Sequence, residues 1–281
     1  MIGWLTDPFT LGFMQRALVA SIIVGVVCAV IGCYVVLRSM AFLGDALAHA
    51  ILPGVAVAYL LGANLVAGAL VAGLVVAVGI SFVSRGGTIR EDTAIGIFFA
   101  AALALGVVLI STMHTYAVDL THVLFGNVLG VTVTDLWISG LLAFAVLGAI
   151  LLLYKRLLVV SFDPVLGQTL GLHTHALRTG LFLMLAATIV VALRTVGVGL
   201  VAAMLVTPPA AAYLLTRRLP IMMAVSALIG ILSAVGGLYA SYYLNVASGG
   251  AMVLVATAVF VLAFLFAPER GALWRLKRRR D

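Results

Sequence analysis

An aspartate and a histidine four residues apart have the types and the spacing for metal chemistry. Asp45 and His49 lie in the apolar stretch Met40 to Gly54, and residues at i and i+4 share one face of a helix. An ionised carboxylate costs about 2.5 to 3.5 kcal/mol or more at the centre of a bilayer, so we expect something to compensate it. A divalent cation would do so, because carboxylate oxygen with imidazole nitrogen suits Mn(II), Fe(II) or Zn(II). The alternative is that Asp45 lies in water at the end of a span and His49 bonds a neighbouring helix.

The composition of the chain places these two residues in a membrane protein. Of the 281 residues, 65% are hydrophobic and 9% are charged, and the mean hydropathy is +1.30. A soluble domain carries roughly 25% charged residues, so a water-soluble fold is excluded. The 16 basic and 9 acidic residues give a net charge of +7. In so apolar a chain this excess is typical of cytoplasmic loops and not of nucleic-acid binding.

Nine apolar segments approach the roughly 20 residues needed to cross a bilayer. They cover residues 17–37, 41–62, 65–84, 93–113, 133–153, 177–193, 196–216, 221–240 and 250–267. Only a few residues separate 41–62 from 65–84 and 177–193 from 196–216. One of these two pairs could therefore form a single bent element, which leaves eight or nine spans. We therefore predict one all-α, polytopic membrane domain over residues 1–281. If nine spans alternate, most basic residues and the carboxy terminus lie on the cytoplasmic side.

A second candidate site is a short helix on the side predicted to be cytoplasmic. Asp163 can cap its amino terminus, Pro164 can occupy its first position, and Gly171 can end it. Its apolar residues, which need a partner, are Val165, Leu166 and Leu170. The partner could be the bilayer surface or, as we favour, a separate cytoplasmic protein. The chain has no G-x-x-x-x-G-K-[ST] motif, so it cannot bind ATP through a P-loop, and ATP-driven work would require another subunit.

Several stretches follow one another in the order found in a known family. They are Met40 to Gly54, Arg90 to Ile97, Asp119 to Gly130, Leu205 to Ala210 and Gly237 to Gly249. Together they resemble the manganese/zinc permease family of bacterial ABC importers, and the resemblance covers nearly the whole chain. It departs at Pro208-Pro209, where the family more often has Thr-Pro-Ala. Two prolines remove two backbone donors, so we expect further unwinding of that helix.

The resemblance implies a type II ABC importer-like permease in the bacterial plasma membrane, working by alternating access on Mn(II) or Zn(II). It implies a homodimer of this chain in the lipid bilayer, with two cytoplasmic ATPase subunits and an extracytoplasmic metal-binding protein. No permanently bound cofactor is expected, and the chain is not expected to be an enzyme. By the same resemblance the metal-pathway residues fall on Asp45 and His49. The helix that couples to the ATPase falls on Asp163, Pro164, Val165, Leu166, Gly167, Leu170 and Gly171.

The other histidines give weaker signals. His114 and His122 share a loop with Asp119 that is predicted to lie outside the cell. There they could contact the delivered metal or the protein that delivers it, although plain solvent-exposed roles are favoured. His173 and His175 follow the short cytoplasmic helix. They could take up or sense the exiting ion, although the interpretation as ordinary loop residues is favoured.

Two acidic residues and several arginines receive structural interpretations. Glu91 and Asp92 precede an apolar segment, and we interpret them as serving the amino terminus of a helix that begins near Thr93, where the helix dipole favours acids, in preference to a metal role. Arg38 and Arg178 count toward the orientation of the chain in the membrane.

Three other functions are compatible with parts of the sequence. A siderophore or cobalamin permease is typically longer, and its organic ligand would not call for an acid and an imidazole at 45 and 49. An intramembrane metalloprotease would use Asp45, His49 and a further ligand to activate water, but the chain has no H-E-x-x-H motif. A proton-driven secondary metal transporter would work without an ATPase, so co-purification of an ATPase separates it from an ABC importer.

Overall fold

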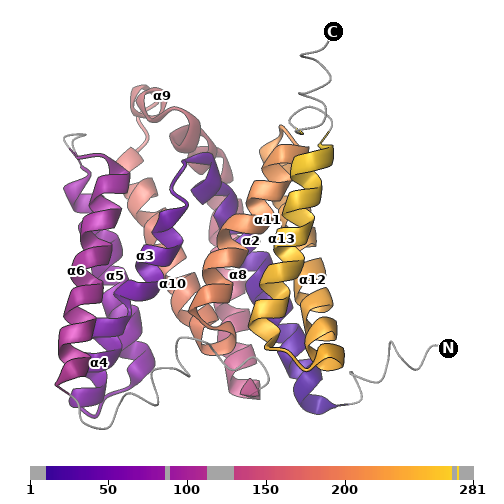
Figure 1. Ribbon diagram of the computed structural model, residues 1–281. Helices are drawn as coiled ribbons and strands as arrows, with labels where there is room; N and C mark the ends of the chain where they lie inside the picture. The colour runs from indigo at the N-terminus through magenta and orange to yellow at the C-terminus, as the bar shows by residue number, and fades with distance from the viewer. Residues whose placement is uncertain (1–10, 86–88, 113–129, 268–270, 272–281) are drawn as a thin grey trace.

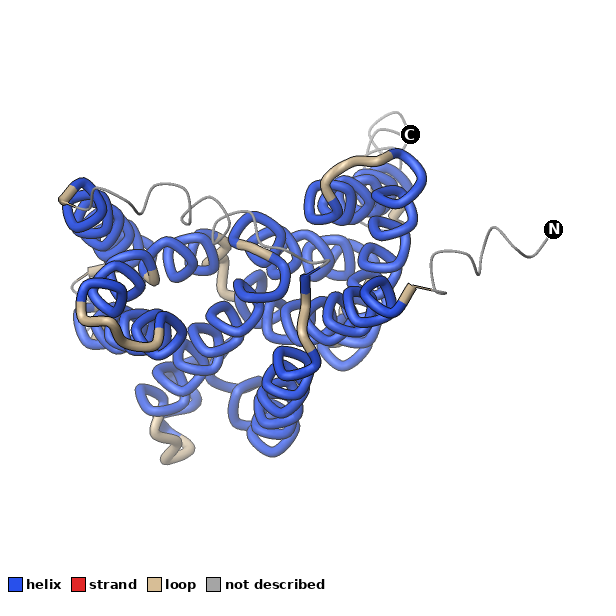
Figure 2. Tube along the Cα trace, turned by 90° about the horizontal axis from the view of Figure 1, so that it is seen from below, coloured by secondary structure: helices blue, strands red, loops and turns tan. Residues whose placement is uncertain are grey.

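The protein is a bundle of helices whose axes lie roughly along one common direction. The computed structural model describes residues 11–85, 89–112, 130–267 and 271. Within these ranges every regular element is helical, as predicted, and Figure 2 shows most helices nearly end-on. The elements are α2 (Gly12–Leu37), α3 (Phe42–Ala50), α4 (Leu52–Leu60), α5 (Leu65–Val83), α6 (Glu91–Ser111), α8 (Val133–Phe162), α9 (Pro164–Thr169), α10 (Thr174–Val196), α11 (Val198–Leu215), α12 (Leu219–Leu244) and α13 (Ser248–Phe266).

The described helices agree with the predicted range of eight or nine spans. Eight helical segments are long and apolar enough to cross a membrane, with α3 and α4 together forming the segment Phe42–Leu60. The remaining predicted span corresponds to α11, which contains the shorter apolar helix Leu200–Leu215. Successive long helices alternate in direction, so α2 starts at the end of the bundle opposite to the end where α13 finishes (Figure 1). The short helix α9 lies at the latter end, which we call the α9 end.

The surface of the bundle is apolar where a membrane would touch it. On α8, Trp137 is 76% exposed, Phe144 is 79% exposed and Leu152 is 88% exposed. A water-soluble protein rarely leaves a contiguous row of large apolar side chains uncovered. This surface therefore agrees with a multi-pass membrane protein whose outer helices face lipid or another subunit.

Local sequence explains where several helices end. A glycine in the left-handed region, Gly197 with φ of 84°, separates α10 from α11. The second span is interrupted at Ile51, where α3 ends and α4 begins, two residues before Pro53. Proline lacks the N–H that would continue the hydrogen-bond ladder of α3, so the helix breaks just ahead of it.

The expected unwinding at Pro208-Pro209 is wrong, because α11 remains a continuous helix from Val198 to Leu215. Pro209 cannot donate to the carbonyl of Leu205, four residues earlier. A Cβ atom added to Gly32 of α2 would overlap this same carbonyl oxygen and would come within 2.8 Å of the Pro209 ring. The glycine thus allows α2 to pack directly against the proline-containing turn, where the helix remains continuous.

Replacing Gly32 with alanine is therefore expected to destabilise the protein by about 1 to 3 kcal/mol, the usual cost of overpacking. The clashing atoms belong to backbone and to a proline ring, so neither can move aside cheaply. The measurement is thermal unfolding of the purified protein in detergent. Gly148→Ala is the matched control, since a Cβ at Gly148 of α8 meets nothing within 4 Å. Equal unfolding temperatures for the two variants would contradict the close packing of α2 on α11.

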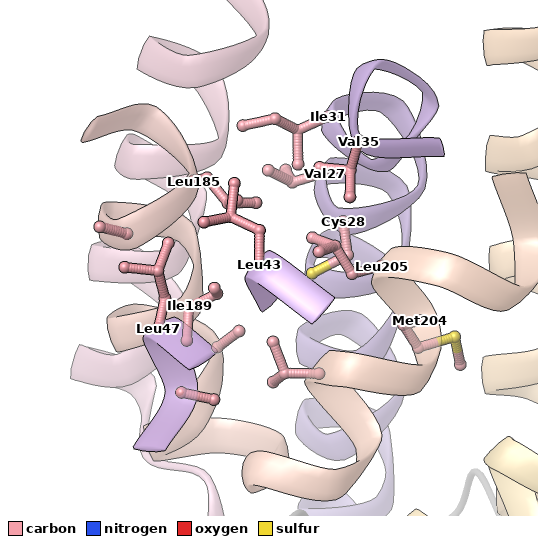
Figure 3. Close-up of a cluster of buried hydrophobic side chains, with 14 of the residues drawn as sticks. Val27, Cys28, Ile31, Val35, Leu43, Leu47, Leu185, Ile189, Met204 and Leu205 are labelled. Atoms are coloured by element: carbon pink, nitrogen blue, oxygen red, sulfur yellow. The ribbon is translucent and has the colours of Figure 1, made fainter. Parts of the chain in front are cut away.

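The hydrophobic core surrounds α3 and fixes its position. Leu43 and Leu47 of α3 are fully buried. Figure 3 shows them among side chains of α2, α10 and α11. The neighbours in this view are Val27, Ile31, Leu185, Ile189 and Leu205. One face of α3 is thus anchored in the core, and the orientation of its other face is determined by this packing.

Candidate functional site

The buried face of α3 directs Asp45 and His49 to the opposite side of the helix. Each lies two residues after a buried leucine, Leu43 or Leu47, and two residues correspond to about 200° around a helix. In the single chain the Asp45 side chain is 47% exposed and the His49 side chain is 26% exposed. The prediction that the two residues share one helix face is confirmed, and that face is open enough for a ligand.

The pair lies deep in the bundle. A Cβ atom on Gly44, which precedes Asp45, would come within 2.5 Å of Cδ2 of Leu205, so this turn of α3 is level with the middle of α11. Leu205 is ten residues before Leu215, the last residue of α11, which corresponds to about 15 Å along the helix axis. A carboxylate at this depth would require a compensating partner wherever lipid or another subunit covers the open face of α3.

The geometry of the pair leaves one imidazole nitrogen available. Nδ1 of His49 lies 3.0 Å from the backbone carbonyl oxygen of Asp45 and 3.5 Å from its Oδ1 atom. When Nδ1–H donates to these oxygens, the lone pair of Nε2 is left for a ligand. The imidazole also packs edge-on against Phe99 of α6, with ring centroids 5.4 Å apart. A histidine oriented in this way, through its second nitrogen, is typical of metal sites.

One chain supplies an incomplete set of metal ligands at this position. In the part of the chain that the structure describes, no group of three or more histidine, cysteine, aspartate or glutamate side chains could hold a metal ion. Mn(II) commonly takes octahedral coordination with oxygen-rich ligands. The two side chains of the pair would therefore need further ligands from water, from backbone carbonyls or from a second chain.

The predicted short helix is present as α9. Oδ1 of Asp163 accepts hydrogen bonds from the backbone N–H groups of Val165 and Leu166, each at 3.0 Å, and Pro164 takes the first helical position. Gly171 follows the helix with φ of 72°, in the left-handed region that glycine favours. The local structure predicted from these residues is confirmed.

The apolar side chains of α9 point away from the bundle. Val165 is 68% exposed, Leu166 is 48% exposed and Leu170 is 61% exposed, whereas Gly167 is buried. A Cβ at Gly167 would lie 3.0 Å from Cγ2 of Thr174, so this glycine lets α9 pack closely on the start of α10. The helix lies at one end of the bundle (Figure 1), and the exposure of these three residues gives it an uncovered apolar surface there.

Other predicted site residues do not join the pair. His114, Asp119 and His122 lie outside the described residues. His173 is exposed just before α10, and His175 lies in the first turn of α10, so the interpretation of both as loop residues is wrong for His175.

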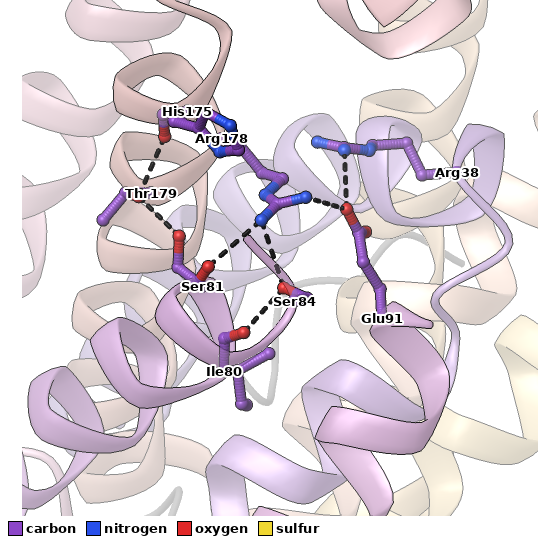
Figure 4. Close-up of polar contacts among 8 residues, drawn as sticks. All are labelled: Arg38, Ile80, Ser81, Ser84, Glu91, His175, Arg178 and Thr179. Atoms are coloured by element: carbon purple, nitrogen blue, oxygen red, sulfur yellow. Dashed lines mark hydrogen bonds and ion pairs between the residues drawn. The ribbon is translucent and has the colours of Figure 1, made fainter. Parts of the chain in front are cut away.

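Sequence reasoning missed a polar cluster at the α9 end. Glu91 lies at the amino terminus of helix α6, as predicted, but its Oε1 atom also accepts hydrogen bonds from two arginines (Figure 4). Nη2 of Arg38 lies 3.2 Å away and Nη1 of Arg178 lies 2.8 Å away. The partners are 53 and 87 residues from Glu91 in the sequence, so no local spacing could have indicated the contact.

Comparison with known proteins agrees with this architecture. The model of the ABC 3 transport family matches residues 10–267. The manganese transport system membrane protein MntC of Halalkalibacterium halodurans is 49% identical over 272 residues, which are 96% of this chain and 93% of that protein. The chelated iron transport system membrane protein YfeD of Yersinia pestis is 40% identical over 270 residues, which are 95% of this chain and 89% of that protein.

A solved structure is similar over the full length. The structure of PsaBC from Streptococcus pneumoniae in complex with Fab superimposes with a TM-score of 0.85 at 38% sequence identity and covers 100% of both chains. The family resemblance expected from the sequence is confirmed, and the chain belongs to the ABC 3 transport family.

Proposed function

We propose that this chain is the membrane-spanning subunit through which an ATP-driven importer moves manganese(II), with zinc(II) as the second candidate ion. The observation that carries the proposal is the Asp45–His49 pair on the open face of α3, deep in the bundle. Manganese is preferred over iron because MntC, named for manganese transport, is 49% identical to this chain, whereas YfeD, named for iron transport, is 40% identical.

The pair would bind the ion transiently during transport. Two copies of the chain would offer up to two carboxylates and two imidazoles near a shared axis, which answers the incomplete ligand set of one copy. These groups need not all bind at once. An ion held in a complete and tight shell would leave slowly, so a partial shell supplemented by water suits a transport site.

The exposed apolar surface of α9 would dock a cytoplasmic ATPase subunit. The chain has no P-loop, so a partner must hydrolyse the ATP, and this chain would act in transport alone. Closure of two ATPases would pull the α9 helices of both copies and change which side of the shared interface is open.

Charge distribution supports a cytoplasmic position for the α9 end. Most of the described basic residues lie there, whereas Arg16 in α2 and Arg194 near the end of α10 lie toward the opposite end. The basic residues at the α9 end are Arg38, Arg85, Arg90, Lys155, Arg156, Arg178, Arg217 and Arg218. By the positive-inside rule the end of α13 and the carboxy terminus would then be cytoplasmic, and an extracytoplasmic protein would deliver the metal to the other end.

The test is uptake of radioactive manganese by vesicles that contain this chain, its ATPase and its metal-binding protein. We expect uptake to require ATP, to be blocked by a non-hydrolysable ATP analogue and to be unaffected by a protonophore. Zinc in tenfold excess is included as the competitor that identifies the preferred ion. Uptake without ATP that a protonophore abolishes would replace the proposal with a proton-driven transporter. Absence of manganese and zinc uptake would overturn the choice of metal.

A further inference from the structure

The cluster around Glu91 joins four helices at the α9 end. Besides its contact with Glu91, Arg178 of α10 donates through Nη2 to the backbone carbonyl oxygen of Ser81 in α5 and to Oγ of Ser84, each at 3.1 Å. Arg38, directly after α2, completes the set by its contact with Glu91 at the start of α6. Figure 4 shows these side chains converging from α5, α6, α10 and the end of α2.

The charges in the cluster are largely shielded from solvent. The side chains of Arg38, Arg178 and Glu91 are 10%, 13% and 23% exposed, respectively. Such a site is costly to break, because removal of one charge leaves the others buried without a partner. Here the loss of the Glu91 charge would leave two arginines close together without the carboxylate that bridges the start of α10 and the end of α2.

Burial and the two neighbouring charges do not all shift the pKa of the Arg38 guanidinium in the same direction. Burial lowers the pKa of the Arg38 guanidinium from its ordinary value; the Glu91 carboxylate opposes this shift, and Arg178 adds to it. Neutralising the carboxylate would remove the one influence that favours the charged form of Arg38.

The position of the cluster along the chain connects the two candidate sites. Arg178 lies in the second turn of α10, nine residues after the end of α9 at Thr169. Arg38 lies four residues before Phe42, where α3 begins, and α3 carries Asp45 and His49. The ion pairs through Glu91 are therefore a short, direct link between the helix that would dock the ATPase and the helix that would hold the metal.

We propose that Glu91 is a positioning residue that couples α9 to α3. Its carboxylate ties the start of α10 to the connection between α2 and α3, so a displacement of α9 and α10 is passed to the metal pair. The proposal rests on the proposed function, since it assigns a role within ATP-driven transport. Glu91 does not contact the transported ion in this account.

The experiment measures manganese uptake and ATP hydrolysis together in proteoliposomes that contain the complete importer. For Glu91→Gln we expect the number of ions imported per ATP hydrolysed to fall about tenfold. A factor of about ten is a usual size for the coupling between two sites in a protein. ATP hydrolysis is expected to persist, because α9 and its docking surface are unchanged. Asp92→Asn is the matched control, since Asp92 is the exposed neighbouring acid, and it should keep the wild-type ratio.

Three further variants test whether the Glu91 ion pairs carry the coupling. Arg178→Gln should lower the ratio as Glu91→Gln does, and the double variant should lower it little further, because both changes break the same contact. Should Glu91→Gln not fold, Glu91→Asp keeps the charge but withdraws the carboxylate by one methylene, and an intermediate ratio is expected.

Three outcomes would overturn the proposal. They are a wild-type ratio in Glu91→Gln, a wild-type ratio in Arg178→Gln, and a parallel loss of uptake and ATP hydrolysis together with a lower unfolding temperature. The last result would identify the cluster as purely structural. A wild-type importer that moves no manganese with ATP would instead contradict the proposed function itself, so the two failures are distinguishable.

Discussion

Manganese uptake is expected to fall about 100-fold when either Asp45 or His49 is replaced with alanine, since even groups that only orient metal ligands cost 10- to 100-fold when removed. The two side chains lie on the open face of α3 and contact each other at 3.5 Å, so each would contribute to the same ion. Neither belongs to the buried core, and the unfolding temperature and the yield of assembled importer should be unchanged. The measurement is uptake of radioactive manganese in cells that lack their own manganese importers.

Two variants serve as controls for the loss of charge and of imidazole. Asp92→Ala removes an exposed carboxylate in the first turn of α6, and His173→Ala removes an exposed imidazole before α10. Both are expected to transport manganese at the wild-type rate. Retained uptake in Asp45→Ala and in His49→Ala would show that the ion takes another path.

Placing a carboxylate on α9 is expected to abolish transport by a different mechanism. Leu166→Asp would put an uncompensated charge in the proposed ATPase interface. Leaving a charge buried and unpaired at an interface costs about 2 to 5 kcal/mol of binding free energy. The ATPase subunit should no longer co-purify, and ATP-dependent uptake should fall to background. The side chain is 48% exposed in the single chain, so the fold itself should tolerate the change.

Leu61→Asp is the matched control for the α9 variant. Leu61 follows α4, is 75% exposed and lies at the end of the bundle opposite to α9. It should leave the co-purification of the ATPase intact. Equal recovery of the ATPase with Leu166→Asp and with Leu61→Asp would mean that α9 is not the docking surface.

The helical architecture was predictable because each span is encoded by its own apolar run. The largest difference in length is at α8, predicted over 133–153, which continues to Phe162. The apolar run that defines the predicted span ends before Lys155 and Arg156. Both residues have good helix propensity, so the helical backbone continues through them. The boundary between α10 and α11 was placed at Arg194-Thr195 for the same reason, but the backbone breaks at Gly197.

Contacts between distant segments were not predictable from spacing. The i to i+4 relation of Asp45 and His49 is local, and it appears in the structure as expected. The bridging role of Glu91 depends on arginines in other helices, which could be read from sequence only as topological charges. Likewise, the close approach of Gly32 in α2 to the Pro208-Pro209 turn of the continuous helix α11 joins segments that are far apart in the sequence.

Electron paramagnetic resonance of Mn(II) bound to the purified importer would show directly whether manganese binds at the Asp45–His49 pair. We expect nitrogen couplings from an imidazole in the wild type and in His173→Ala, and their loss in His49→Ala. Nitrogen couplings that persist in His49→Ala, or a wild-type spectrum of fully hydrated Mn(II) at saturating metal, would contradict it.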